Sequence, residues 1–323
     1  MPLPDLRKCS ALNLLVWIPK NFQKLLALGL VAGFLWPNLI APLATWNDLM
    51  VAGIIFNGFL TRQAETIAKN DFPRLAINIA VVKILFPIIL YFATRSLDPD
   101  ISVPLVLLAS IPAAGVSPSL IRLLGGDGGL ATKILLSESI VSCAMVPLLF
   151  SFFYEAEHTV SSVALARYFS LVLLIPLILA WTFRKIVGPQ KVAALAPWGS
   201  AVSVILIVTL VSAIAGKISP ALIAEPHKSL VLVAVACLAV PLFGLISLVV
   251  NRPRSKAEAI TFMIKNNYIN IGLGLGIAAS YFSPGVAMAL LAYVIPVNLL
   301  PRVMGKLAVF IYSYSIKKAL LNN

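Results

Sequence analysis

The chain has 323 residues, of which 60% are hydrophobic and 11% charged, a composition that excludes a soluble globular protein. An excess of 25 Lys and Arg over 12 Asp and Glu would suggest nucleic acid as the partner of a soluble protein. Here the basic residues lie between long apolar stretches, so we expect a lipid bilayer as the partner and no nucleic acid.

Residues 1–24 hold a short apolar run that Pro19 and Lys20 interrupt, which is typical of an uncleaved cytoplasmic lead-in. Apolar stretches long enough to cross a bilayer then recur to residue 312, and charged or Pro/Gly-rich breaks divide them into ten predicted transmembrane helices. These ten helices lie near residues 25–41, 46–61, 72–96, 102–124, 130–154, 164–186, 194–216, 228–250, 257–281 and 285–311, and a tail follows at 313–323.

The positive charges orient these ten helices. With the N-terminus inside, the cytoplasmic segments hold 19 Lys and Arg and the outside loops hold 4. Because basic loops stay on the cytoplasmic side, we predict a multi-pass protein of the cell (inner or plasma) membrane with both termini cytoplasmic. The two remaining lysines, Lys83 and Lys265, fall within predicted helices.

An internal repeat relates the two halves of the chain. Pro87 in "VVKILFPIIL" matches Pro241 in "VACLAVPLFG", and Pro147 matches Pro296 at a similar separation. Each half holds five helices, an odd number, so the halves enter the membrane from opposite sides, as in many secondary transporters. The alternative is a chance match, since prolines are common in membrane helices.

The fourth and ninth helices carry the strongest breaking signals. The fourth reads "LASIPAAGVSPSLIRLLGGD", in which Pro118 lacks the N–H group that a continuous helix needs. The ninth reads "KNNYINIGLGLG", in which asparagines compete with helical hydrogen bonds and glycines weaken the helix. We therefore predict that both helices are broken and cross each other, with freed peptide groups facing protein or a water-filled cavity.

Polar side chains of the predicted helices gather at similar depths. An ionised side chain at the bilayer centre costs about 2.5–3.5 kcal/mol, so Lys265 is expected to pair with Glu138. Lys83, or Lys265 when the pair opens, is then expected to contact an anionic ligand. The alternatives are that Lys83 binds carbonyls of a neighbouring helix, that the pair is purely structural, and that the asparagines only cross-link helices. The predicted substrate- or ion-binding residues are Lys83, Ser117, Pro118, Ser119, Glu138, Lys265, Asn266, Asn267, Asn270 and Asn298.

Three of these stretches resemble the bile acid:sodium symporter family, part of the bile acid/auxin/arsenite-type transporter superfamily. "LASIPAAGVSPSLIRLLGGDGGLATKILLSESIVSCAMVPLL" is similar to the family's fourth and fifth helices, "KNNYINIGLGLGIA" to its ninth, and "FNGFLT" to the end of its second. The resemblance implies inverted repeats over 25–154 and 164–312. It also implies a core domain of helices 3–5 and 8–10 that rocks against a panel domain of helices 1, 2, 6 and 7, with an organic anion bound where helices 4 and 9 cross.

The positions that would bind sodium in this family differ here. The family's Ser-Asn falls on Ser117 and Pro118, its hydroxyl ligands fall near Ala131 and Leu135, and Lys265 lies where an acidic residue is expected. A lysine ammonium group then stands where sodium would otherwise bind. We therefore expect altered or absent sodium coupling, with no cofactor. The alternatives are proton coupling through Glu138, facilitated transport without a coupling ion, and a bound sodium ion.

The predicted function is a secondary membrane transporter that moves a small organic anion by alternating access. The alternatives are a sodium-coupled organic-anion symporter of the bile-acid type and a non-transporting membrane scaffold. An enzyme is not expected, because the predicted helices contain no histidine and no paired carboxylates. The sequence leaves the oligomeric state open.

Overall fold

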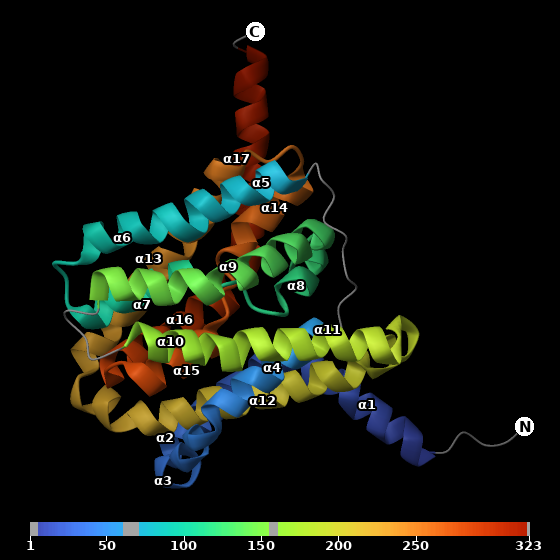
Figure 1. The fold of residues 1–323 in the computed structure, drawn as a ribbon, viewed down its shortest axis with the longest axis vertical. Helices are drawn as coiled ribbons and strands as arrows, with labels where there is room; N and C mark the ends of the chain where they lie inside the picture. The colour runs from blue at the N-terminus through green and yellow to red at the C-terminus, as the bar shows by residue number, and fades with distance from the viewer. Residues whose placement is uncertain (1–5, 61–70, 155–160, 322–323) are drawn as a thin grey trace, which may run out of the picture. The chain divides into compact units, whose positions relative to one another are not determined.

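The computed structural model describes residues 6–60, 71–154 and 161–321, and every regular element in that part is a helix (Figure 1). The predicted all-α class is confirmed. The chain divides into two compact units, and each unit combines two distant stretches of sequence. Unit 1 comprises Met1–Gln63 and Phe169–Pro220, and unit 2 comprises Ala64–Tyr168 and Ala221–Asn323.

The described part of unit 1 contains one bent helix pair, Asn13–Lys20 with Phe22–Leu35, and all or part of three longer helical spans. Its elements are α1 (Leu6–Lys20), α2 (Phe22–Leu35), α3 (Pro37–Ile40), the 3-10 helix η1 (Ala41–Trp46), α4 (Asn47–Leu60), the π-helix η4 (Ser170–Leu174), α11 (Ile175–Val187) and most of α12 (Pro189–Ala224).

Close packing of α2 on α12 depends on two glycines of α2. A Cβ added at Gly29 would lie 2.5 Å from Ser212 Oγ, and one added at Gly33 would overlap the carbonyl oxygen of the same serine. The two glycines are four residues apart and face one way, which is the small-residue spacing that lets membrane helices approach closely. Elsewhere in unit 1, α4 packs on α11 through the rings of Phe56 and Phe183.

Unit 2 holds both interrupted stretches and the candidate site. Its elements are α5 (Phe72–Ile77), the π-helix η3 (Asn78–Leu85), α6 (Phe86–Thr94), α7 (Pro99–Ser110), α8 (Ser117–Leu123), α9 (Gly128–Tyr154), most of α10 (Ser162–Phe169), α13 (Pro226–Asn251), α14 (Lys256–Lys265), α15 (Ile271–Tyr281), α16 (Pro284–Leu299) and α17 (Pro301–Leu321).

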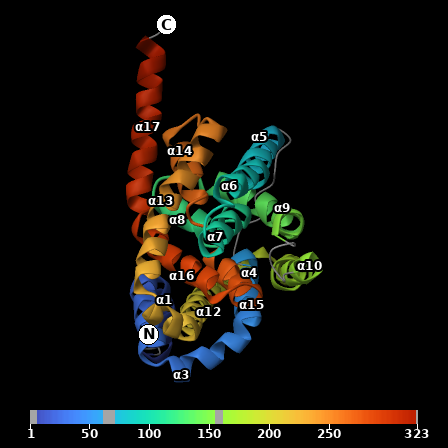
Figure 2. The ribbon, with the colours of Figure 1, turned by 90° about the vertical axis from the view of Figure 1, so that its left-hand side faces the viewer.

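Within unit 2, α13 packs on α16 and α14 packs on α17. Figure 2 shows α14 beside α17, whose C-terminal part projects past it. The buried cluster between these elements includes Ile121, Leu248, Met263 and Met304, so apolar contacts hold the interrupted stretches in place.

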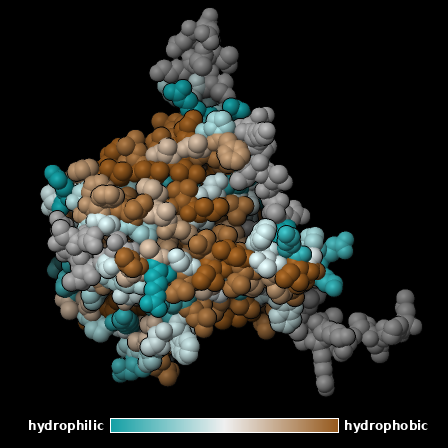
Figure 3. Space-filling view, in the orientation of Figure 1, coloured by the Kyte–Doolittle hydropathy of each residue, from teal (hydrophilic) through white to brown (hydrophobic). Residues whose placement is uncertain are grey.

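The described residues contain six helices that are long and apolar enough to cross a membrane, or up to eight if each bent pair counts as one crossing. Apolar side chains also point outward, as on α6, where Ile89 and Phe92 are exposed, and on α9, where Leu148 and Phe152 are exposed. Hydrophobic side chains cover much of the face drawn in Figure 3. The structure thus confirms a helical membrane protein.

The expected boundary between the first two transmembrane helices, at residues 41–46, is wrong. Residues Pro37–Leu60 form one candidate span of 24 residues, and the chain departs from helix at Trp36. Pro37 begins this span at the first helical position, where a missing N–H costs nothing. The next proline, Pro42, is accommodated in the 3-10 turn of η1.

The last predicted helix, 285–311, is also not straight. Pro284–Leu299 and Pro301–Ser315 meet at a bend of 63°. Pro301 explains the bend, because its ring clashes with the preceding turn and its nitrogen cannot donate a hydrogen bond.

We expect Gly33→Ala to lower stability by about 1–3 kcal/mol, because an added methyl group meets backbone of α12 that cannot move aside. Thermal unfolding of the detergent-solubilised full chain measures the effect. Gly53→Ala is the matched control, since its methyl group would meet only the flexible end of Leu206. Equal melting temperatures for the two variants would contradict close packing of α2 on α12.

Candidate functional site

Two non-helical segments of unit 2 cross each other. Residues 111–116 separate α7 from α8, and residues 266–270 separate α14 from α15. Ala113 and Ile269 form an antiparallel bridge, in which Ala114 N donates to Tyr268 O at 2.8 Å and Asn270 N donates to Pro112 O at 3.0 Å. Each break thus supplies hydrogen-bond partners that the other break needs. We call residues 111–116 and 266–270 the crossing.

The first break arises at Pro112 rather than at Pro118. Ile111 ends α7 with extended dihedral angles, φ −73° and ψ 154°, as the residue before a proline prefers. Pro118 instead lies in the first turn of α8, where proline is tolerated. The expectation that Pro118 interrupts the helix is therefore wrong, although the break lies in the predicted stretch.

Three charged side chains lie buried beside the crossing. Lys265, the last residue of α14, forms the expected ion pair with Oε1 of Glu138 on α9. Lys83 of η3 lies 4.0 Å from Oε2 of the same carboxylate and donates to the carbonyls of Ala109 at 3.3 Å and Ile111 at 2.9 Å. Lys83 thus makes the carbonyl contacts considered as its alternative. We call Lys83, Glu138 and Lys265 the charge cluster.

Two asparagines that the sequence analysis missed extend the charge cluster to α13. Asn78 Nδ2 donates to Glu138 Oε1 at 3.0 Å, and Asn78 Oδ1 accepts from Asn251 Nδ2 at 3.0 Å. Asn251 also donates to the carbonyl of Ser247, one turn earlier on α13. A hydrogen-bonded path therefore joins α13, η3, α9 and α14.

The π-helix η3 places Asn78 and Lys83 on one side of their helix. In a π-helix the backbone bonds join residues five apart, and these two residues are five apart. Both side chains consequently reach Glu138. The sequence signal for Asn78 was an asparagine five residues before an intramembrane lysine. That spacing places both side chains on one side of the helix only when the helix is a π-helix.

Several buried polar groups at the crossing have no hydrogen-bond partner in the described part of the chain. They are the hydroxyl of Ser117 and both side-chain polar atoms of Asn266 and Asn267. Each such group costs about 1–3 kcal/mol when it stays unpaired, so the arrangement is suited to a ligand or to water. Asn267 approaches α13 where Gly244 lacks a side chain, because a Cβ there would overlap its amide nitrogen.

The other predicted binding residues have local roles or lie elsewhere. Asn270 caps α15, with Oδ1 accepting from Leu273 N at 3.1 Å. Asn298 donates to Val294 O of its own helix at 2.8 Å. Ser119 is exposed, so its side chain does not join the buried groups, and Pro118 is buried in α8.

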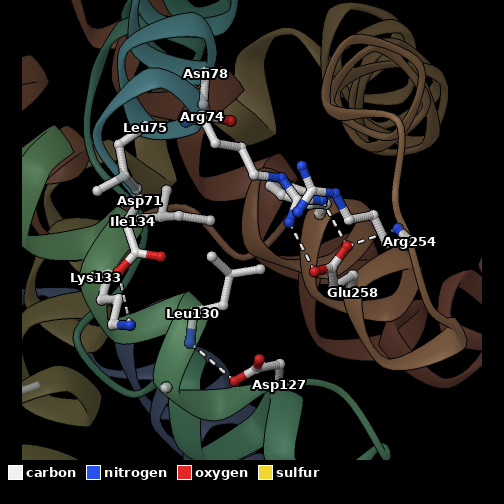
Figure 4. Close-up of a pocket in the computed structure, with 12 residues that line it drawn as sticks. Asp71, Arg74, Leu75, Asn78, Asp127, Leu130, Lys133, Ile134, Arg254 and Glu258 are labelled. Atoms are coloured by element: carbon white, nitrogen blue, oxygen red, sulfur yellow. Dashed lines mark hydrogen bonds and ion pairs between the residues drawn. The ribbon is translucent and has the colours of Figure 1, made fainter. Parts of the chain in front are cut away.

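A polar pocket of about 310 Å³ lies beside the charge cluster, between α5, α9 and α14 (Figure 4). Arg74 forms a two-pronged ion pair with Glu258, at 2.7 and 2.6 Å, and the Arg254 backbone N–H donates to the same carboxylate. Lys133 pairs with Asp71 at 2.9 Å on the opposite wall. Asn78 lines this pocket and also contacts Glu138, so it separates the pocket from the charge cluster.

Comparisons with protein-family models and with curated protein sequences give no match to this chain. Within the described residues, no group of three or more His, Cys, Asp or Glu side chains is placed to hold a metal ion. The chemistry of the candidate site therefore rests on its ammonium, carboxylate, amide and hydroxyl groups.

We expect Glu138→Gln to destabilise the protein by about 3–5 kcal/mol, because it leaves the buried ammonium group of Lys265 without its counter-charge. A second change, Lys265→Met, should recover part of that loss by removing the buried charge that is left unpaired. Thermal unfolding of the single and double variants measures the coupling. Additive losses in the double variant would argue against the ion pair, and Ser119→Ala, at an exposed site, is the control expected to leave stability unchanged.

Proposed function

We propose that this protein is a secondary membrane transporter that binds a small organic anion at the crossing and moves it by alternating access. The observation that carries the proposal is a buried charge cluster with one more positive than negative group, next to unpaired amides and a hydroxyl. Charges and polar groups inside a membrane protein are costly, and they mark substrate or ion sites. A monovalent anion would balance the charge and bond to the amides.

Ten transmembrane crossings are consistent with these helices. The six long helices and two bent pairs account for up to eight. Counting α7 with α8, and α14 with α15, as one interrupted crossing each brings the number to ten. Non-helical backbone at membrane depth is tolerated where it is buried in protein or lines a cavity, which is the situation at the crossing.

Matching ion pairs support the inverted repeat. Arg74, at the start of α5, pairs with Glu258 in the first turn of α14, and Lys228, at the start of α13, pairs with Asp100 in the first turn of α7. Arg74 and Lys228 are 154 residues apart, the same separation as the two matched prolines, 87 and 241. Each half of the chain thus contributes the base to one pair and the acid to the other.

Matching helix caps support the same relation. Asp98 caps α7 and Ser255 caps α14, 157 residues apart; Asp127 caps the first turn of α9 and Ser283 caps α16, 156 residues apart. A two-fold relation between the halves explains why caps recur at nearly constant separation. Secondary transporters with inverted repeats bind their substrate at the repeat interface, at discontinuous helices.

The division into two units supports a cycle in which one unit moves against the other. The crossing, the charge cluster and the pocket all belong to unit 2, so this unit would carry the anion. Lys83 binds the last carbonyls of α7, and Lys265 ends α14. Half-helix C-termini are where sodium-coupled transporters hold their cation, so these ammonium groups support transport without sodium.

We expect taurocholate or pantoate to raise the melting temperature of the full chain in potassium buffer as much as in sodium buffer. Replacing Asn266 or Asn267 by Ala should weaken the binding of the active anion about tenfold, or about 1.4 kcal/mol, because each amide loses a bond to the anion. Ser119→Ala and Asn298→Ala are matched controls that should bind like the parent chain.

Other outcomes of this screen would overturn parts of the proposal. Stabilisation that requires sodium and disappears in Ser117→Ala would identify a sodium-coupled symporter instead. The absence of any shift across a panel of steroid acids and small carboxylates would contradict the proposed substrate class.

A further inference from the structure

The charge cluster is unusual because its charges do not cancel. Lys83 is 3% exposed, and Glu138 and Lys265 are 0% exposed; these three are the only buried charged side chains among the described residues. With all three ionised, the cluster carries a net charge of +1. An uncompensated buried charge costs several kcal/mol, so a state in which the site has no net charge is strongly favoured.

Among the residues that the structure describes, the neighbouring elements offer no buried charge that compensates this excess. Asn78 of η3 and Asn251 of α13 are neutral amides, and α7 contributes the carbonyls of Ala109 and Ile111. Tyr293 on α16 carries a neutral phenol. The described charged side chains elsewhere on α5, α7, α9, α13 and α14, and on the loop after α13, are not buried. They already form ion pairs or lie outside the buried region, and the paired ones are Arg74 with Glu258, Lys133 with Asp71 and Lys228 with Asp100.

The cluster can reach neutrality in two ways. It can gain a monovalent anion at the crossing, or one lysine can release its proton. Protonation of Glu138 is not a third way, because it would raise the net charge to +2. Anion binding and proton release are therefore two alternative ways to remove the same excess charge, so the site that binds an anion can also keep the proton.

The contacts identify Lys83 as the residue that exchanges the proton. Its two hydrogen bonds go to carbonyls, and a neutral amine keeps two N–H groups that can make both. Its distance of 4.0 Å from Glu138 Oε2 is too long for a hydrogen bond. Lys265, in contrast, is in direct ion contact with Glu138, and this contact needs the ammonium form.

We propose that Lys83 is a proton site coupled to the anion site, so that the binding of one monovalent anion at the crossing is accompanied by the uptake of one proton. The lysine amine accepts a proton from water and becomes an ammonium group; on anion release it returns the proton. This inference rests on the proposed function and deepens it, because it makes the protein an anion–proton symporter whose coupling ion is bound by a side chain.

The polar pocket supplies a route for that proton. It is lined in part by Asn78, whose amide contacts Glu138, and the far oxygen of that carboxylate is 4.0 Å from Lys83 Nζ. A proton can therefore pass between pocket water and Lys83 over a short distance when the network opens locally. The route is separate from the crossing, where the anion would bind.

Calorimetry of the full chain with taurocholate and with pantoate, in buffers of different ionisation enthalpy, counts the protons taken up. Both probes are fully ionised near neutral pH, so they bring no proton of their own. We expect one proton per bound anion for the parent chain and none for Lys83→Gln, whose amide can still donate to the carbonyls. Lys228→Gln, which removes a lysine from the opposite end of unit 2, should still take up one proton. Binding without proton uptake by the parent chain would overturn the coupling and leave the proposed function standing.

A second measurement needs no anion. Nitrogen-15 NMR of the lysine side chains, without anion at neutral pH, should show one neutral amine that disappears in Lys83→Gln. It should also disappear in Lys265→Gln, because Lys83 then becomes the sole partner of Glu138 and takes the ammonium form. Ammonium signals from both buried lysines in the parent chain would overturn the inference. An amine signal together with no binding of either probe would retain the proton site and contradict the proposed substrate class.

Discussion

The fold of unit 2 depends on the requirement that buried peptide groups find hydrogen-bond partners. A membrane offers no water to the N–H and C=O groups that a broken helix exposes. Here the two breaks meet, and Ala114 with Tyr268, and Asn270 with Pro112, bond across the crossing. Neither interruption could be buried alone without leaving several peptide groups unpaired. The chain must therefore fold residues more than 150 positions apart together before either break is stable.

The charge cluster extends this dependence from backbone to side chains. Lys83 donates to the carbonyls that the end of α7 leaves free, so one lysine side chain both bonds to the break and approaches Glu138. Asn78 and Asn251 then tie the carboxylate to α13. A single buried network thus fixes the positions of the helices around the crossing, while Ser117 and two asparagines keep unused hydrogen-bonding capacity. Rigidity and binding capacity are supplied by different residues of one site.

The sequence located the broken stretches because their causes are local. Proline and consecutive asparagines oppose helix wherever they occur, and a buried lysine requires an acidic partner, which led to Lys265 and Glu138. Details that depend on tertiary contacts were missed or wrong. Pro118 is compatible with a helix start, so Pro112 makes the break. Asn78 reaches Glu138 because its helix is a π-helix. Asn270 and Asn298 bond to backbone groups close to them in sequence, and the sequence alone does not distinguish such asparagines from ones that bind a ligand.

The wide turn of η3 has a consequence for how this helix can vary. A π-helix holds an extra residue relative to ordinary α-helical winding, so removing one residue between positions 78 and 83 would restore the α form. The amide and the ammonium group would then be four residues apart in an α-helix, a spacing that keeps them on one face, so both could still reach the carboxylate. The present five-residue spacing wound as an α-helix would instead point them to different sides. Natural relatives of this chain that keep both groups should therefore combine a spacing of five residues with a π-helix, or a spacing of four residues with an α-helix.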